Sequence, residues 1–352
     1  MNKPALSLLK QYRSGWIRTG WIAVALLCFG TGCASNESAN LEPQQYSATN
    51  KAAVQMPIES YQQAMEQAER ARLEANWEGA LFAYIRSLDF QPDNSDIYLQ
   101  IARIHHRLNN QDLAIKAYQQ VIALSPEVIE AQQAVGVYYL QQRNYQQAKV
   151  HLSKAIAEDQ KRLAKAGETT EKSSFVPNDE SPIEAYTALA VIFDMEKQFI
   201  KSREYYKLAL AGQPNSVNIL SNLGYSYYLN NEYRQAEQYF KKAIRINPKF
   251  KRAWTNLGLV YVREQDYDKA LKTFKQVMPD YEAYNDLGYL VMLEGRLVEA
   301  EYFLGKAIEL SPRYFKKANV NLEQVQILKK DYQQSVNEYP GMISEQPQVV
   351  NK

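Results

Sequence analysis

The sequence has few cysteines, glycines and prolines, and it has no long apolar run. Its 352 residues include 2 Cys, 14 Gly and 13 Pro. Both cysteines, Cys28 and Cys33, lie near the N-terminus, so the rest of the chain has no thiol for a disulfide, a redox site or a metal cluster. The apolar run from Trp21 to Phe29 is too short for a transmembrane helix, which needs about 20 residues.

Catalytic motifs are also missing. The sequence contains no HExxH, GxxxxGK[ST] or GxSxG pattern, and its three histidines are His105, His106 and His151. Adjacent histidines on a helix point about 100° apart, which disfavours a shared metal ion. His105 occupies the repeat position of the tyrosine that packs between hairpins, so we interpret it as a packing residue. The formal charge of +2 gives no reason to expect a nucleic-acid partner. We therefore expect no enzyme, no cofactor and no metal.

The first 32 residues have the pattern of a secretory signal. They contain no acidic residue, and four basic residues precede the apolar run: Lys3, Lys10, Arg13 and Arg18. A charged segment followed by a short apolar segment is typical of a cleaved signal peptide. Cleavage before Cys33 would change the formal charge from +2 to −2, because four positive charges would leave.

The segment "GTGCAS", residues 30–35, resembles the lipobox of bacterial lipoproteins, although Gly30 stands where that family usually has Leu. The resemblance implies that Cys33 is lipidated, that residues 1–32 are removed, and that Ala34 sends the protein to the outer membrane, facing the periplasm. The alternative is two unrelated cysteines in an ordinary signal peptide or short anchor. Residues 33–60 are polar and aperiodic, which predicts a flexible tether.

A repeat fills most of the remaining chain. The segments "LSNLGYSYYLNNEYRQAEQYFKKAIRINP" (220–248) and "WTNLGLVYVREQDYDKALKTFKQV" (254–277) match a signature of W-x2-L-G-x2-Y, A-x3-F and P. Both contain L-G-x2-Y and A-x3-F, the second supplies the Trp as Trp254, and the first supplies the Pro as Pro248. Pro92 and Pro126 are 34 residues apart, as are Pro214 and Pro248. This pattern identifies the chain as similar to the tetratricopeptide repeat (TPR) family, in which each repeat is a helical hairpin. The resemblance implies an all-α solenoid.

Seven repeats are predicted over residues 61–314, beginning near residues 61, 95, 129, 183, 217, 251 and 281. A polar insertion near residues 163–182 is either a partner contact or, as loops usually are, only solvated. The repeat from residue 251 is shortened by four residues, with Pro279 arriving early. We expect residues 315–336 to form a capping helix and residues 337–352 to be a disordered tail.

TPR proteins bind extended peptides or helices on the concave face, which the first helix of each repeat lines. When the repeat positions of this chain are aligned with those of the family, the resemblance implies a groove in the repeats of residues 217–314. Its predicted contact residues are Asn222, Tyr225, Tyr228, Arg252, Asn256, Arg263, Asn285, Tyr289 and Met292. From Gln238 to Arg263 the chain has seven basic residues and no acid, which either steers a partner or is an ordinary solvated surface.

A lipid-anchored array of TPRs resembles the TadD-like and PilF-like lipoproteins of pilus assembly. That resemblance implies a scaffold with protein partners, among them a secretin or pilus component, and a membrane attachment through the N-terminal lipid. An adaptor for peptidoglycan synthases or hydrolases is the first alternative. A periplasmic enzyme is a second alternative, for which the sequence offers no site.

Overall fold

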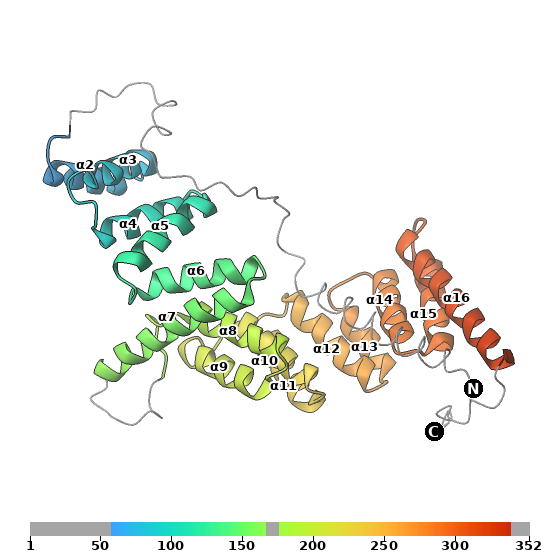
Figure 1. Ribbon diagram of the computed structural model, residues 1–352. Coiled ribbons are helices and arrows are strands. Elements are labelled where there is room, and N and C mark those ends of the chain that lie inside the picture. The colour runs from blue at the N-terminus through green and yellow to red at the C-terminus, as the bar shows by residue number, and fades with distance from the viewer. Residues whose placement is uncertain (1–57, 167–175, 339–352) are drawn as a thin grey trace. The chain divides into compact units, whose positions relative to one another are not determined.

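The computed structural model describes residues 58–166 and 176–338 (Figure 1). These residues form fifteen α-helices and no strand, which confirms the predicted all-α repeat fold. The helices are α2 (Tyr61–Leu73), α3 (Trp77–Ser87), α4 (Ser95–Arg107), α5 (Gln111–Leu124), α6 (Ile129–Gln141), α7 (Tyr145–Ala166), α8 (Ile183–Met195), α9 (Phe199–Gly212), α10 (Val217–Leu229), α11 (Tyr233–Ile246), α12 (Lys251–Arg263), α13 (Tyr267–Phe274), α14 (Asp280–Leu293), α15 (Leu297–Leu310) and α16 (Lys316–Glu338). The predicted signal peptide, most of the tether and the tail lie outside the described residues.

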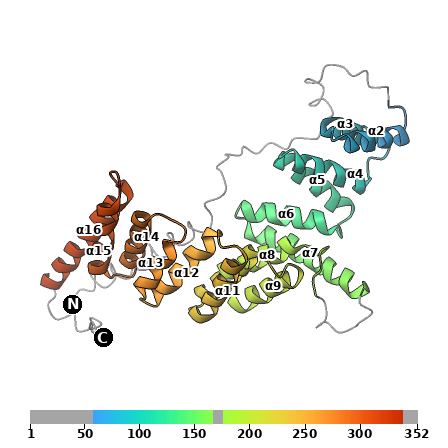
Figure 2. The ribbon, with the colours of Figure 1, turned by 180° about the vertical axis from the view of Figure 1, so that it is seen from behind.

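The first fourteen of these helices form seven hairpins, from α2–α3 to α14–α15, and α16 follows alone (Figures 1 and 2). The second helix of each hairpin also contacts the first helix of the next. Among the last repeats, the first helices α10, α12, α14 and α16 contact one another in turn. Each hairpin therefore buries its apolar surface against its neighbours, as a solenoid requires.

Small residues allow the two helices of a hairpin to cross closely. The small residue that opens each second helix is at most 2% exposed at all seven positions: Ala80, Ala114, Ala148, Ser202, Ala236, Ala270 and Ala300. On the first helix, a Cβ added to Gly224 would lie 2.8 Å from Cε1 of Phe240, and one added to Gly258 would overlap the ring of Phe274. Gly136 and Gly288 meet leucines of their second helices in the same way. The glycines are required because a ring or leucine fills the space of a methyl group.

One left-handed residue turns every hairpin. The residues with positive φ occupy the same repeat position: Ala75, Asn109, Arg143, Lys197, Asn231, Gln265 and Gly295. The backbone N–H of the next residue closes the first helix: Glu232 N donates to Tyr227 O at 2.9 Å, and Asp266 N donates to Tyr261 O at 2.9 Å. This 6→1 bond is the Schellman ending of a helix. Its left-handed residue is usually glycine, yet only the seventh turn has one.

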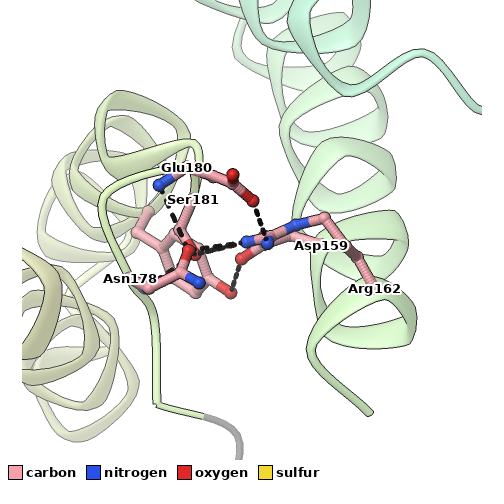
Figure 3. A network of polar contacts seen from close by, with 6 residues as sticks. Asp159, Arg162, Asn178, Glu180 and Ser181 are labelled. Atoms are coloured by element: carbon pink, nitrogen blue, oxygen red, sulfur yellow. Dashed lines mark hydrogen bonds and ion pairs between the residues drawn. The ribbon is translucent and has the colours of Figure 1, made fainter. Parts of the chain in front are cut away.

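Helix α7 ends at Ala166, within the start of the predicted insertion, and a buried carboxylate anchors it. The Asp159 side chain is fully buried and pairs with Arg162, whose Nη2 donates to Oδ1 at 2.7 Å (Figure 3). Its other oxygen, Oδ2, accepts from the Tyr186 hydroxyl of α8 at 3.0 Å, and Ser181 Oγ donates to Oδ1 at 3.2 Å. Burial, with the Asp159 charge, raises the pKa of Tyr186. One carboxylate thus joins α7 to the start of the fourth repeat.

Arg162 extends the same network to the chain that leads into α8. Its Nη2 donates to Asn178 Oδ1 and its Nη1 pairs with Glu180 Oε2, both at 2.8 Å (Figure 3). Asn178 Oδ1 also accepts from the backbone N–H of Glu180 at 3.1 Å. The end of the insertion is therefore held in place by charge-assisted hydrogen bonds.

We predict that Gly258→Ala destabilises the array, because its methyl group would overlap the Phe274 ring. The gain in helix propensity, about 1 kcal/mol, is outweighed by an overpacking cost of about 1–3 kcal/mol. Gly305→Ala in α15 is the matched control, since a Cβ there meets nothing within 4 Å, and it should stabilise by up to about 1 kcal/mol. Urea unfolding midpoints measure both. Equal midpoints for the two variants would contradict the close-crossing account.

We further predict that Asp159→Asn costs about 2 kcal/mol, because it removes the fully buried charge to which Arg162, Tyr186 and Ser181 donate hydrogen bonds. Glu180→Gln removes the other acid bound to Arg162, and the Glu180 side chain is 77% exposed, so its effect should stay below about 1 kcal/mol. Thermal unfolding followed by circular dichroism compares the two. Similar losses for both variants would show that burial of Asp159 is unimportant.

Candidate functional site

The predicted contact residues lie on the first helices α10, α12 and α14. Residues three, four or seven positions apart share one face of a helix, which groups Asn222 with Tyr225 and Arg252 with Asn256. The structure adds that these helices touch one another, so their faces continue from repeat to repeat. We call this surface the first-helix face.

Side-chain hydrogen bonds join the first-helix face across the fifth and sixth repeats. Arg252 Nη2 donates to Asn218 Oδ1 at 3.0 Å, and Asn256 Nδ2 donates to Ser221 Oγ at 3.4 Å. Both bonds link α12 to α10. Two residues predicted to contact a partner are thus also contacts between repeats, which fixes their positions before any partner arrives.

Helix α16 continues this series of side-chain hydrogen bonds between first helices beyond the last hairpin. Asn321 Nδ2 donates to Asn285 Oδ1 at 3.0 Å, and Lys317 Nζ pairs with Asp286 Oδ1 at 2.9 Å. The Asn321–Asn285 bond repeats the geometry of Asn256 on α12. The sequence analysis did not assign Lys317 or Asn321 to the face, although Asn321 keeps the repeat position of Asn222 and Asn256. The capping helix therefore occupies the place of an eighth first helix.

An ion pair and a tyrosine stack mark the C-terminal end of these helices. Arg263 Nη1 lies 3.6 Å from Glu294 Oε1, joining α12 to the end of α14. Burial raises the pKa of Glu294, and the Arg263 charge opposes that rise. The rings of Tyr225 and Tyr228 stack with their centroids 5.7 Å apart. Burial raises the pKa of Tyr228 to about 12, against the opposing effect of Arg263.

Three of the predicted contact residues are buried and need correction. Tyr228 is 4% exposed, Asn285 is 0% exposed and Met292 is 7% exposed. Tyr228 lies beneath Tyr225 and beside Arg263 of the next first helix, whereas Asn285 is taken up by Asn321 of α16. Met292 occupies the same repeat position as Tyr228. These side chains support the surface and do not form it.

The remaining six predicted residues reach the surface to different degrees. Tyr289 is 37% exposed, and Leu293, one turn further along α14, is 38% exposed. Arg252 and Arg263 are exposed, while Asn222, Tyr225 and Asn256 are half-buried. The accessible first-helix face therefore consists of Asn222, Tyr225, Arg252, Asn256, Arg263 and Tyr289.

The described residues contain no arrangement suited to metal chemistry. No group of three or more His, Cys, Asp or Glu within residues 58–166 and 176–338 could hold a metal ion. His105 is 1% exposed inside α4, and burial lowers its pKa. His151 lies apart, with Nδ1 2.8 Å from Gln132 Oε1. In the same part of the chain, no helix has the length and apolar content needed to cross a membrane.

Comparison with known proteins identifies the repeat. Models of the tetratricopeptide repeat match residues 95–128, 217–250 and 239–272. These matches coincide with α4–α5 and with the segment from α10 into α13. No curated protein matches the chain in sequence.

Several solved structures are similar to the chain at low identity. MamA is 21% identical over 54% of this chain and 92% of its own, with a TM-score of 0.42. YrrB, described as a TPR protein with an unusual peptide-binding site, is 16% identical over 63% and 98%, with a TM-score of 0.45. PilF of Pseudomonas aeruginosa is 17% identical over 66% and 96%, with a TM-score of 0.44.

The matched segments carry the same hairpin, the same small residues and the same turn as the hairpins around them. The chain accordingly contains tetratricopeptide repeats, and its described residues form seven helical hairpins followed by a closing helix.

Proposed function

We propose that this protein is a scaffold that binds a protein partner across the first-helix face of α10, α12 and α14. The observation that carries the proposal is the series of hydrogen bonds between first helices, which holds arginine and amide side chains in a row of fixed positions. Side chains that are already ordered lose little entropy on binding, so such a row can use its contacts efficiently. Aromatic and arginine side chains also dominate most protein interfaces.

An extended or helical segment of a partner fits this row best. Asn222 and Asn256 can bond to a partner's backbone, Tyr225 and Tyr289 supply flat apolar contact, and Arg252 can meet a carboxylate. The Arg252 guanidinium lies 5.3 Å from the Phe250 ring centroid, which further limits its motion. No reacting group is part of this recognition, so the proposal is for a binding protein.

The anchor and the cellular role are further parts of the proposal. The "GTGCAS" segment supports lipidation at Cys33, attachment to the outer membrane and a location facing the periplasm. A lipid-anchored TPR scaffold suits assembly of a pilus or its secretin, as the sequence resemblance implies. Recovery of secretin or pilus subunits after crosslinking in membranes supports that role, whereas recovery of murein synthases or hydrolases supports the peptidoglycan adaptor.

We predict that Tyr225→Ala together with Tyr289→Ala weakens partner binding by about thirtyfold, because two aromatic contacts worth about 1 kcal/mol each are lost. Tyr302→Ala on α15 is the matched control, since Tyr302 is 58% exposed on a second helix and off the face. Co-purification of the crosslinked partner, with melting curves to verify folding, gives the readout. A folded double variant that retains full binding would refute the assignment.

We also predict that Cys33→Ser abolishes lipid labelling and leaves the protein unprocessed or soluble. The matched control is Cys28→Ser, which alters the other cysteine and should leave labelling intact. Metabolic labelling with palmitate and membrane fractionation measure both effects. Normal processing and outer-membrane fractionation of the Cys33→Ser protein would contradict the anchor proposal.

A further inference from the structure

The sixth hairpin, α12–α13, lacks an aromatic ring that neighbouring hairpins have. In the fourth hairpin, Tyr186 and Tyr205 have ring centroids 6.4 Å apart. In the seventh, Tyr284 and Phe303 are likewise 6.4 Å apart. Both pairs join the same two repeat positions, one on each helix. In the sixth hairpin these positions hold Trp254 and Thr273, so the tryptophan has no ring opposite it.

The second helix of this hairpin is also short. Helix α13 has 8 residues, whereas α9, α11 and α15 have 14 each. Helix α13 therefore lacks the last turns with which the equivalent helices continue along the boundary to the next hairpin. Thr273 is 7% exposed, and its hydroxyl donates to Lys269 O at 2.7 Å, so it presents no polar group that needs a partner.

The missing ring and the missing turns leave a groove between α11, α12 and α13, which lie side by side in Figures 1 and 2. Its volume is about 510 Å³. It is lined by Gln238, Lys241, Ile244, Arg245, Trp254, Leu257, Tyr261 and Thr273. We call it the Trp254 groove.

Trp254 is held at the wall of this groove. Its indole N–H donates to Pro248 O at 2.8 Å, which fixes the ring from the preceding loop. At the same repeat position in the fifth hairpin, Leu220 is 0% exposed, whereas Trp254 is half-buried. A large apolar surface therefore remains open where the fourth and seventh hairpins have a second ring.

The rim of the groove is basic. Lys241 Nζ pairs with Glu237 Oε1 at 2.7 Å, and the same oxygen accepts from the Tyr261 hydroxyl at 2.7 Å. Arg245, at the end of α11, is exposed and forms no ion pair with another residue of the described segments. The same is true of its basic neighbours Lys242, Lys249 and Lys251. The segment from Gln238 to Arg263 has no acid, so these cations are complementary to an acidic ligand.

We infer that the Trp254 groove binds an acidic segment of a protein partner that inserts an aromatic side chain against Trp254 above Thr273. The inserted ring occupies the space that Tyr205 and Phe303 fill in their own hairpins, and its flanking carboxylates meet Lys241 and Arg245. This site is separate from the first-helix face, because Trp254 and Asn256 lie about 160° apart around α12. The scaffold would then hold two ligands on opposite sides of one helix.

The test uses the full-length chain in detergent and a fluorescein-labelled probe peptide of sequence Asp-Glu-Phe-Glu-Asp, capped at both ends. Fluorescence anisotropy should show saturable binding, and replacing the probe's Phe by Ala should weaken it by more than about tenfold. Thr273→Phe should reduce binding of the Phe probe as strongly, because the protein's own ring then fills the groove. Equal binding of the Phe and Ala probes, or no binding of either, would overturn the inference.

Two more variants distinguish failure of this inference from misfolding of the Thr273→Phe protein and from failure of the proposed function. Arg245→Glu changes an exposed side chain and should weaken the probe several-fold while reducing its salt dependence. Tyr289→Ala lies on the first-helix face and should leave probe binding unchanged. If Thr273→Phe fails to fold, as its melting curve would show, an unchanged affinity in Arg245→Glu overturns the inference. Loss of probe binding in Tyr289→Ala would instead assign the peptide to the first-helix face.

Discussion

The close crossing of the two helices in each hairpin is the contact on which the rest of the structure depends. Each second helix has a buried alanine or serine near its start, and four first helices have a glycine that faces a ring or a leucine of the second helix. This approach brings Phe240 against Gly224 and Phe274 against Gly258, so the ring of one helix lies on the backbone of the other. Because each hairpin has the same spacing, the first helices line up in a continuous row.

Much of the fold could be predicted from the sequence because the small residues and the terminal prolines recur at fixed spacing. The seven hairpins begin where this pattern places them, and α13 is short where Pro279 arrives early. The left-handed turns could not be predicted in the same way. Arg143, Lys197 and Gln265 are not residues that favour positive φ, and the 6→1 hydrogen bonds of the helix ends impose it.

The candidate sites were less predictable because they depend on contacts between repeats. Register alone placed Tyr228 and Asn285 on the binding face, but Arg263 and Asn321 from following helices cover or engage them. The Trp254 groove combines two features, a threonine where the fourth and seventh hairpins have a ring, and a shortened helix. Both are visible in the sequence, yet only the packed helices show that together they open a space.

The two surfaces give one helix two roles. Helix α12 presents Arg252 and Asn256 to the first-helix face, and Trp254 and Leu257 to the groove on its other side. Rigid neighbours on both sides fix the helix, so a ligand on either surface meets side chains that are already positioned.

The central claim is that a protein partner binds along the first helices of the C-terminal repeats. The most direct measurement is photo-crosslinking in living cells, with a photoreactive amino acid placed at position 289 on α14 or at position 302 on α15. Both native tyrosines are exposed, at 37% and 58%, so accessibility does not favour the first-helix face. The account predicts a discrete adduct from position 289 and none from position 302. An adduct from position 302 alone would contradict it.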